Sequence, residues 1–171
     1  MRYFIELSYN GKAYHGWQIQ PNAISVQEVL EKGLSTLLKE PIATMGAGRT
    51  DAGVHATQLF AHFDTEALFD IKTLIYKLNS FLPEDIAIKS IFKVKANSHA
   101  RFHATSRQYL YRIALEKNPF NKEQAFLLKP KLNIDKLKAA TKILLDYKDF
   151  QCFSKSNTDV KTYHCNIMKA E

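Results

Sequence analysis

The first hundred residues alternate between two hydrophobic patterns, one typical of strands and one typical of helices. Residues 2–9 are rich in aromatic and β-branched side chains and end at an Asn-Gly turn, which favours a strand. Between 26 and 39 the apolar residues recur at helical spacing, and Ser25 with Glu28 forms a capping box in front of them. The pattern therefore predicts a strand over 2–9 and a helix over 26–39.

The same alternation continues to about residue 98. A short strand over 42–45 and a strand over 58–65 are followed by a helix that Asp70 caps and Pro83 ends. A strand over 86–94 completes the series. The order β-α-β-β-α-β is that of the ferredoxin-like unit, so we expect an N-terminal α/β half over residues 1–98.

A second, shorter series occupies residues 99–171. It contains a predicted strand over 107–115, a turn over 117–121, a helix over 134–145 capped by Asn133, and a strand over 160–169. These elements make an incomplete second α/β half, and the fold class expected for the whole chain is α+β. With so few elements, the apolar face of the helix lacks a cover, and we expect it to stay exposed.

The composition fits a folded protein with a polyanionic partner. Apolar residues make up 46% of the 171, which argues against global disorder. The formal net charge of +7 suits such a partner, although a mildly basic balance also serves solubility. No apolar run approaches the roughly 20 residues of a membrane helix, and the N-terminus has no signal-peptide pattern. We therefore expect a cytoplasmic protein with no membrane contact, in which Cys152 and Cys165 are reduced thiols.

Three of the six glycines fall within residues 46–53. Glycine accepts positive φ and lets other backbone approach closely, so this segment is predicted to be a shaped loop. Arg49 and Asp51 point the same way if the loop is extended. A guanidinium beside a carboxylate keeps it ionised, and an ionised carboxylate can act as a base or a nucleophile. The alternative is a tight turn with a surface ion pair, and glycine spacing alone does not decide.

Three separated blocks resemble the tRNA pseudouridine synthase A family. They read YNG (9–11) with YHGWQ (14–18) and SVQ (25–27), then GRTDAGVH (48–55), then ARFHATSRQYLY (100–111). The resemblance implies the pseudouridine synthase fold, which has two α/β halves around a cleft. It also implies an isomerase that converts uridine to pseudouridine in the anticodon stem-loop of tRNA, at positions 38, 39 and 40. The implied full-length protein is a homodimer without a cofactor.

The resemblance assigns the catalytic role to Asp51, as the nucleophile of the isomerisation. Its alternative role is a turn cap. Tyr109 matches the family tyrosine that lies against the target base, where stacking is worth about 1–3 kcal/mol. A tyrosine in the core of the 107–115 strand is the other interpretation, and Tyr111 points the same way along that strand. Arg49 is expected to contact RNA and to help hold the base out of its stack.

Further RNA contacts are expected from Arg101, Arg107, His55 and Gln18. Three of the five arginines, at 101, 107 and 112, lie within twelve residues, and arginine suits forked contacts to phosphate. Ordinary solvated arginines are the alternative for Arg101 and Arg112. Trp17 is expected to be a core side chain rather than an RNA contact, because large aromatic residues are mostly buried.

The chemistry explains the need for a carboxylate. The reaction that the resemblance implies breaks the N-glycosidic bond, rotates the base and joins its C5 atom to the ribose. The carboxylate can add to the base, add to C1′, or remove the 2′ proton, and the sequence leaves these routes open. No redox step or external group is needed, so no cofactor is expected. The histidines and cysteines show no standard metal spacing, so no metal is expected either.

Two other functions fit parts of the pattern. A non-catalytic RNA-binding module of the RRM type would have the same element order, but its aromatic signature is absent. A nucleotide phosphate loop at 46–53 would need a following Gly-Lys-Ser/Thr, which the sequence does not have.

Family members continue past the point that matches Glu171, and their later part includes a basic residue that pairs with the catalytic aspartate. We therefore expect this chain alone to be oligomeric or aggregation-prone and inactive. Segments 149–150 and 154–159 resemble the family's loop near the tRNA.

Overall fold

The computed structural model describes residues 1–154 and 162–171 and divides into two units, Met1–Tyr109 and Leu110–Glu171. Most of the expected tRNA-side loop over 154–159, and the start of the strand expected over 160–169, lie outside the described residues. The domain boundary expected at residue 98 stays a prediction.

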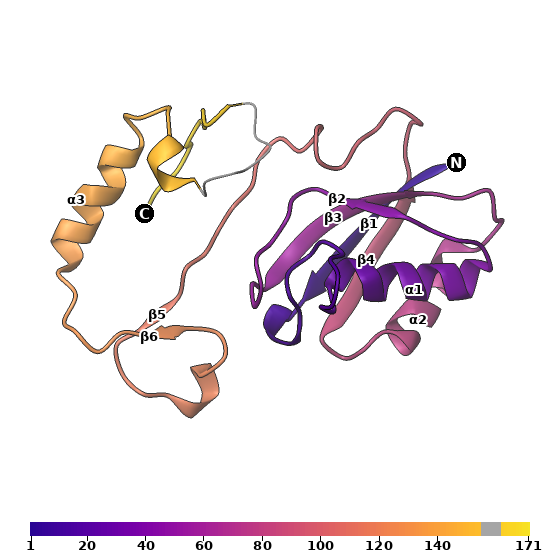
Figure 1. Cartoon of the computed structure of the whole chain (residues 1–171), viewed down its shortest axis with the longest axis horizontal. Coiled ribbons are helices and arrows are strands. Elements are labelled where there is room, and N and C mark those ends of the chain that lie inside the picture. The colour runs from indigo at the N-terminus through magenta and orange to yellow at the C-terminus, as the bar shows by residue number, and fades with distance from the viewer. Residues whose placement is uncertain (155–161) are drawn as a thin grey trace. The chain divides into compact units, whose positions relative to one another are not determined.

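The first unit is a four-stranded antiparallel sheet with two helices (Figure 1). Its strands β1 (Arg2–Tyr9), β2 (Thr44–Gly46), β3 (Ala56–Asp64) and β4 (Ile86–Lys93) lie in the order β2-β3-β1-β4. The helices are α1 (Val26–Leu38) and α2 (Ile71–Phe81). The predicted β-α-β-β-α-β order is therefore the observed one, and the α+β class is confirmed.

Local signals place these elements where they lie. Alternate residues of β1, from Tyr3 to Tyr9, are buried, because one face of the strand packs into the core. The Ser25 hydroxyl accepts the Glu28 N–H at 3.2 Å at the start of α1, and the Asp70 carboxylate accepts the Thr73 N–H at 2.8 Å at the start of α2. The core is made of Ile5, Leu7, Val26, Leu30, Leu34, Phe63 and Leu78, all essentially without exposed surface.

The second unit has little regular structure among its described residues. Strands β5 (Ile113–Ala114) and β6 (Phe126–Leu127) pair in parallel, and helix α3 (Ile134–Leu144) follows. Short 3-10 turns lie at η2 (Pro119–Asn121) and η3 (Gln151–Phe153), with η1 (Gly11–Ala13) in the first unit. Asn133 caps α3 as predicted, since its side chain accepts the Lys136 N–H at 2.9 Å.

The strand predicted over 107–115 is wrong except for its last residues, 113–114. Residues 107–112 have no strand structure, and their aromatic side chains are exposed. Alternating apolar residues indicate which face a strand would bury, but a strand also needs a neighbour to satisfy its backbone groups. The final strand is also wrong over 162–169, where the described backbone makes only an isolated bridge between Asp149 and His164.

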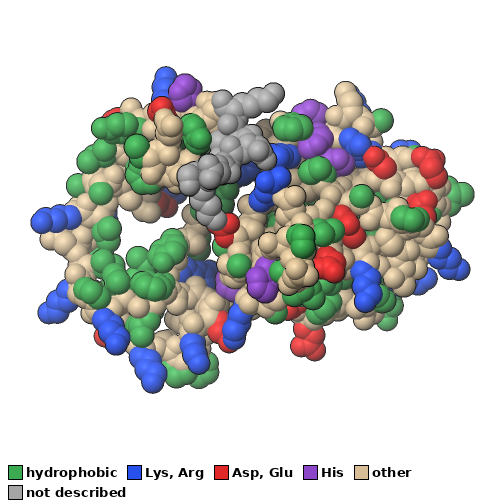
Figure 2. Space-filling view, in the orientation of Figure 1, with side chains coloured by type: hydrophobic (Ala, Val, Ile, Leu, Met, Phe, Trp, Pro, Cys, Tyr) green, Lys and Arg blue, Asp and Glu red, His purple; other side chains and the backbone are tan. Residues whose placement is uncertain are grey.

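The exposed apolar surface expected on the second unit is confirmed. In α3, Ile134 is 49% exposed and Leu137 is 42% exposed, and no residue of the helix is buried. Figure 2 shows such hydrophobic side chains on the surface of this unit, in green. The helix therefore presents an unpaired apolar stripe.

Candidate functional site

The candidate site is the loop that joins β2 to β3, residues 47–55. The Val54 N–H donates to the Asp51 carbonyl at 3.2 Å, which closes a turn over 51–54. Gly53 has φ +77° within this turn, a conformation that glycine adopts without strain. The Asp51 side chain is exposed at the start of the turn. A carboxylate here can reach a ligand without leaving its turn.

The backbone of residues 10–17 packs directly against this loop. The Trp17 N–H donates to the Thr50 carbonyl at 3.2 Å. A Cβ on Gly16, which has φ +86°, would lie 2.1 Å from the same carbonyl oxygen. A Cβ on Gly11 would lie 1.9 Å from the Val54 carbonyl oxygen. Glycine is therefore required at both positions because two backbone segments touch there.

Side chains add further contacts between the two segments. The Gly11 N–H donates to Nδ1 of His55 at 3.0 Å, so this nitrogen is an acceptor. The Tyr9 hydroxyl lies 3.0 Å from the Thr50 Oγ1. The Trp17 ring is buried against Gly46, which confirms its expected core role. The loop is thus held by β1 and by residues 10–17.

Residues 10–17, the bracing segment of the loop, are themselves anchored by Tyr14. Its backbone carbonyl accepts the Gly53 N–H at 3.1 Å, and its hydroxyl donates to the Asp85 Oδ1 at 2.6 Å. Burial and the Asp85 carboxylate raise the pKa of Tyr14, so its hydroxyl stays protonated and remains a donor. The Asn10 N–H also donates to the Asp85 carbonyl at 2.8 Å. Asp85 therefore holds this segment at Asn10 and at Tyr14.

Arg107 contacts the other side of the loop. Its Nη2 lies 2.6 Å from the Ala47 carbonyl oxygen and 3.0 Å from the Arg101 carbonyl oxygen, and its Nε lies 3.3 Å from the Ala47 oxygen. The side chain was expected to contact RNA, and it is exposed. Its Nε and Nη2 nevertheless donate to the backbone carbonyls of Ala47 and Arg101, so the side chain also links residue 101 to the loop.

The start of the third block is held on the sheet by a buried histidine. The Ala100 N–H donates to the His62 Nδ1 at 3.1 Å. Burial, followed by the positive charge of Arg2, lowers the pKa of His62, so the neutral acceptor form is favoured. Arg101 follows directly and is exposed, with its guanidinium carbon 5.8 Å from the centroid of the Phe102 ring.

The other expected site residues lie at the surface. Arg49 is exposed and makes no hydrogen bond or ion pair with any residue the structure describes, so the surface ion pair with Asp51 is not formed. Tyr109 is 80% exposed at the end of the first unit, so it is not a core tyrosine. Gln18, directly after residues 10–17, and His55, at the end of the loop, are exposed. Arg49, Asp51 and His55 thus share one loop, to which Arg107 hydrogen-bonds, whereas no hydrogen bond or ring contact described here joins Tyr109 to them.

Sequence reasoning missed Tyr9, Thr50, Tyr14 and Asp85. These residues shape the loop rather than line its surface. The glycines at 11 and 16 were the available signal, since glycine allows another backbone segment to approach closely. Nothing in the sequence showed which segment they approach.

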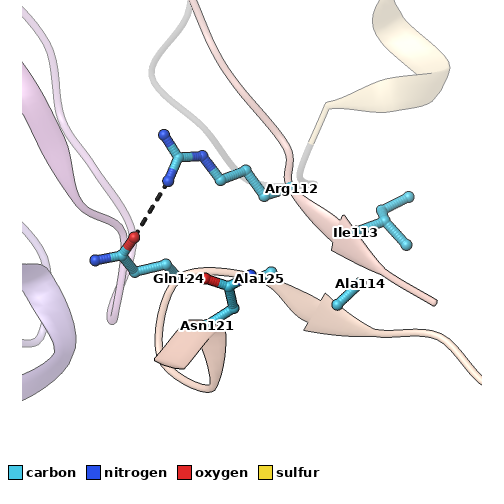
Figure 3. A pocket seen from close by; sticks show the side chains of 6 residues that line it. All are labelled: Arg112, Ile113, Ala114, Asn121, Gln124 and Ala125. Carbon is cyan, nitrogen blue, oxygen red and sulfur yellow. Dashed lines mark hydrogen bonds between the residues drawn. The ribbon is translucent and has the colours of Figure 1, made fainter. Parts of the chain in front are cut away.

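Neither a metal site nor a membrane span appears in the described part of the chain. No group of three or more His, Cys, Asp or Glu residues there could hold a metal ion. None of the described helices is long and apolar enough to cross a bilayer. A pocket of about 300 Å³ lies in the second unit, where Arg112 donates to Gln124 Oε1 at 3.2 Å (Figure 3). It contains none of the expected site residues.

Comparison with known proteins shows what this loop belongs to. The family model described as tRNA pseudouridine synthase matches residues 7–103, which include the bracing segment and the Asp51 loop. The chain belongs to the tRNA pseudouridine synthase family. This confirms the resemblance drawn from the three blocks, and with it the expected class of enzyme, an isomerase that acts on tRNA.

Individual relatives agree with the family model. The chain is 50% identical over 170 residues to the tRNA pseudouridine synthase A of Parabacteroides distasonis, covering 99% of this chain and 68% of the relative. It is 49% identical over 170 residues to that of Bacteroides thetaiotaomicron, covering 99% and 63%. A Geobacter relative is 39% identical over 158 residues, covering 91% and 64%. The chain thus spans roughly two thirds of the length of these family members.

Proposed function

We propose that Asp51 is the catalytic carboxylate of a tRNA pseudouridine synthase that modifies uridines 38, 39 and 40 in the anticodon stem-loop. One observation carries the proposal. The Asp51 side chain is exposed on a loop whose backbone is held from two sides, by residues 10–17 and by Arg107. A reactive group on a fixed backbone meets its substrate with little loss of conformational freedom, and positioning of this kind lowers a barrier substantially.

The exposed residues around Asp51 supply the RNA contacts in this proposal. Arg49 has its guanidinium available for a phosphate, and Arg101 is also exposed. His55 lies on the same exposed loop, where its Nδ1 accepts the Gly11 N–H. The exposed ring of Tyr109 is the stacking surface for the extruded base. Gln18 directly follows residues 10–17, is exposed, and completes the set.

The reaction itself needs no added group. The bond between N1 and C1′ breaks, the base turns, and a bond between C5 and C1′ forms. C5 loses its proton and N1 gains one, so substrate and product have the same atoms. Asp51 can take part by adding to the base, by adding to C1′ or by removing the 2′ proton. We propose that the enzyme works without a cofactor, in the cytoplasm, and as a homodimer in its full-length form.

Pseudouridine mapping tests the proposal. A tRNA transcript with uridines at 38, 39 and 40 is incubated with this chain and with a version extended at its C-terminus to the length of its relatives. The matched control is a transcript with cytidine at these positions. We expect the extended protein to convert the uridines and to leave the control unmodified. If the extended protein binds the tRNA and converts no uridine, the non-catalytic RNA-binding module is the better account.

A further inference from the structure

We propose that Tyr9 is a positioning residue for Asp51 and acts through the side chain of Thr50. The inference rests on the proposed role of Asp51. It concerns a residue that touches no substrate, because Tyr9 is 4% exposed and belongs to the buried face of β1.

The contact between Tyr9 and Thr50 is a partly buried hydrogen bond across a long sequence separation. The two hydroxyl oxygens lie 3.0 Å apart and come from residues 41 positions apart in the chain. Either hydroxyl can donate. Thr50 directly precedes Asp51, so fixing its side chain limits how the backbone at Asp51 can turn.

Tyr9 also supports the second anchor of Thr50. Its ring packs against the ring of Trp17, with centroids 6.4 Å apart at an angle of 33°. The Trp17 N–H in turn donates to the Thr50 carbonyl. Thr50 is therefore held by its side chain and by its backbone. Tyr9 makes the first contact through its hydroxyl and supports the second through the ring of Trp17. No other residue of β1 hydrogen-bonds to the Asp51 loop through its side chain among the interactions described.

A kinetic comparison of two matched variants tests the proposal in the full-length protein. Tyr9→Phe removes the hydroxyl and keeps the ring. Tyr3→Phe is the control, because Tyr3 lies on the same strand and the same face and is 8% exposed. Among the described residues its hydroxyl has one hydrogen bond, a long one of 4.0 Å to the Met1 sulfur. Because misplacement of a reacting group by 1 Å can cost about a hundredfold, we expect Tyr9→Phe to lower kcat by about tenfold or more. We expect Kd for tRNA to stay unchanged, and Tyr3→Phe to keep the parent kcat.

Thr50 variants show whether the effect passes through that residue. Thr50→Ser keeps the hydroxyl and should retain kcat, whereas Thr50→Val should lower it as Tyr9→Phe does. The double variant of Tyr9→Phe and Thr50→Val should be no slower than either single variant, because both remove the same contact. If the losses in kcat of the two single variants multiply in the double variant, the proposed coupling is wrong. It is also wrong if Tyr9→Phe has the same kcat as the Tyr3→Phe control, or if Tyr9→Phe binds tRNA more weakly than the parent.

A readout without catalysis separates this inference from the role of Asp51. Trp17 is the chain's single tryptophan, and its ring lies in the contact between the two segments. Acrylamide should quench its fluorescence more strongly in Tyr9→Phe than in Tyr3→Phe. If quenching rises as expected while Asp51→Asn remains active, the positioning contact stands and the catalytic assignment fails. Equal quenching in the two tyrosine variants contradicts the contact itself.

Discussion

Gly16→Ala is expected to be among the most destabilising single-methyl changes in the first unit. Gly16 has φ +86°, and a Cβ there would lie 2.1 Å from the Thr50 carbonyl oxygen. An L-residue in a left-handed conformation costs about 1–2 kcal/mol relative to glycine. The methyl group must also move more than 1 Å to reach ordinary contact, and forcing atoms into a packed site costs about 1–3 kcal/mol. The two terms give a loss of about 2–5 kcal/mol in the free energy of unfolding.

The assay is urea unfolding followed by Trp17 fluorescence. Gly53→Ala is a matched control, because Gly53 also has positive φ, at +77°, but a Cβ there has no atom within 4 Å. Gly53→Ala should therefore cost only the conformational part, about 1–2 kcal/mol. The difference between the two variants measures the contact between residue 16 and the Asp51 loop. Equal losses in the two variants would refute the reasoning that this contact requires glycine.

Three further changes test the electrostatics and the substrate contacts. Arg49→Ala should release about one counterion fewer on tRNA binding, so the slope of log K against log salt concentration should become shallower by roughly 0.7–0.9. An unchanged slope would show that Arg49 does not contact a phosphate. His62 is neutral in the fold because burial lowers its pKa, so unfolding takes up a proton at low pH and stability should fall as the pH drops below about 6.5. His62→Asn keeps an acceptor for the Ala100 N–H but does not titrate, so it should flatten the pH dependence of stability, measured by urea unfolding at about pH 5.5 and 7.5. A pH dependence as steep as the parent's would exclude His62 as its source. Tyr109→Leu should reduce kcat/KM by about tenfold or more through lost stacking, whereas Tyr109→Phe should lose much less, and an active Leu variant would argue against stacking.

The first unit was predictable because its signals are local. The caps at Ser25 and Asp70 act within three residues, and the periods of the strands and helices are set by their own side chains. The helix predicted over 26–39 is observed as α1, one residue shorter. Sequence alone could also place Asp51 in a glycine-rich loop, since glycine spacing is read directly.

The contacts that shape the loop could not be predicted in the same way. The bond between Tyr9 and Thr50 spans 41 residues and depends on the register of β1 and β3 and on the path of residues 10–17. The hydrogen bonds of Arg107 to the Ala47 and Arg101 carbonyls could not be predicted for the same reason, because Ala47 lies 60 residues away in the sequence. The predicted strand over 107–115 fails for the opposite reason. Its local pattern is strand-like, but the described chain supplies a partner only to 113–114.

The most direct test of the central claim is single-turnover pseudouridine formation by Asp51→Asn in the C-terminally extended protein. Asparagine keeps the size of the side chain and some of its hydrogen bonding but removes the negative charge and the nucleophile. The account predicts that the variant binds tRNA with the parent Kd and forms no detectable pseudouridine at positions 38, 39 and 40. Measurable turnover by Asp51→Asn would contradict the assignment of Asp51 as the catalytic carboxylate.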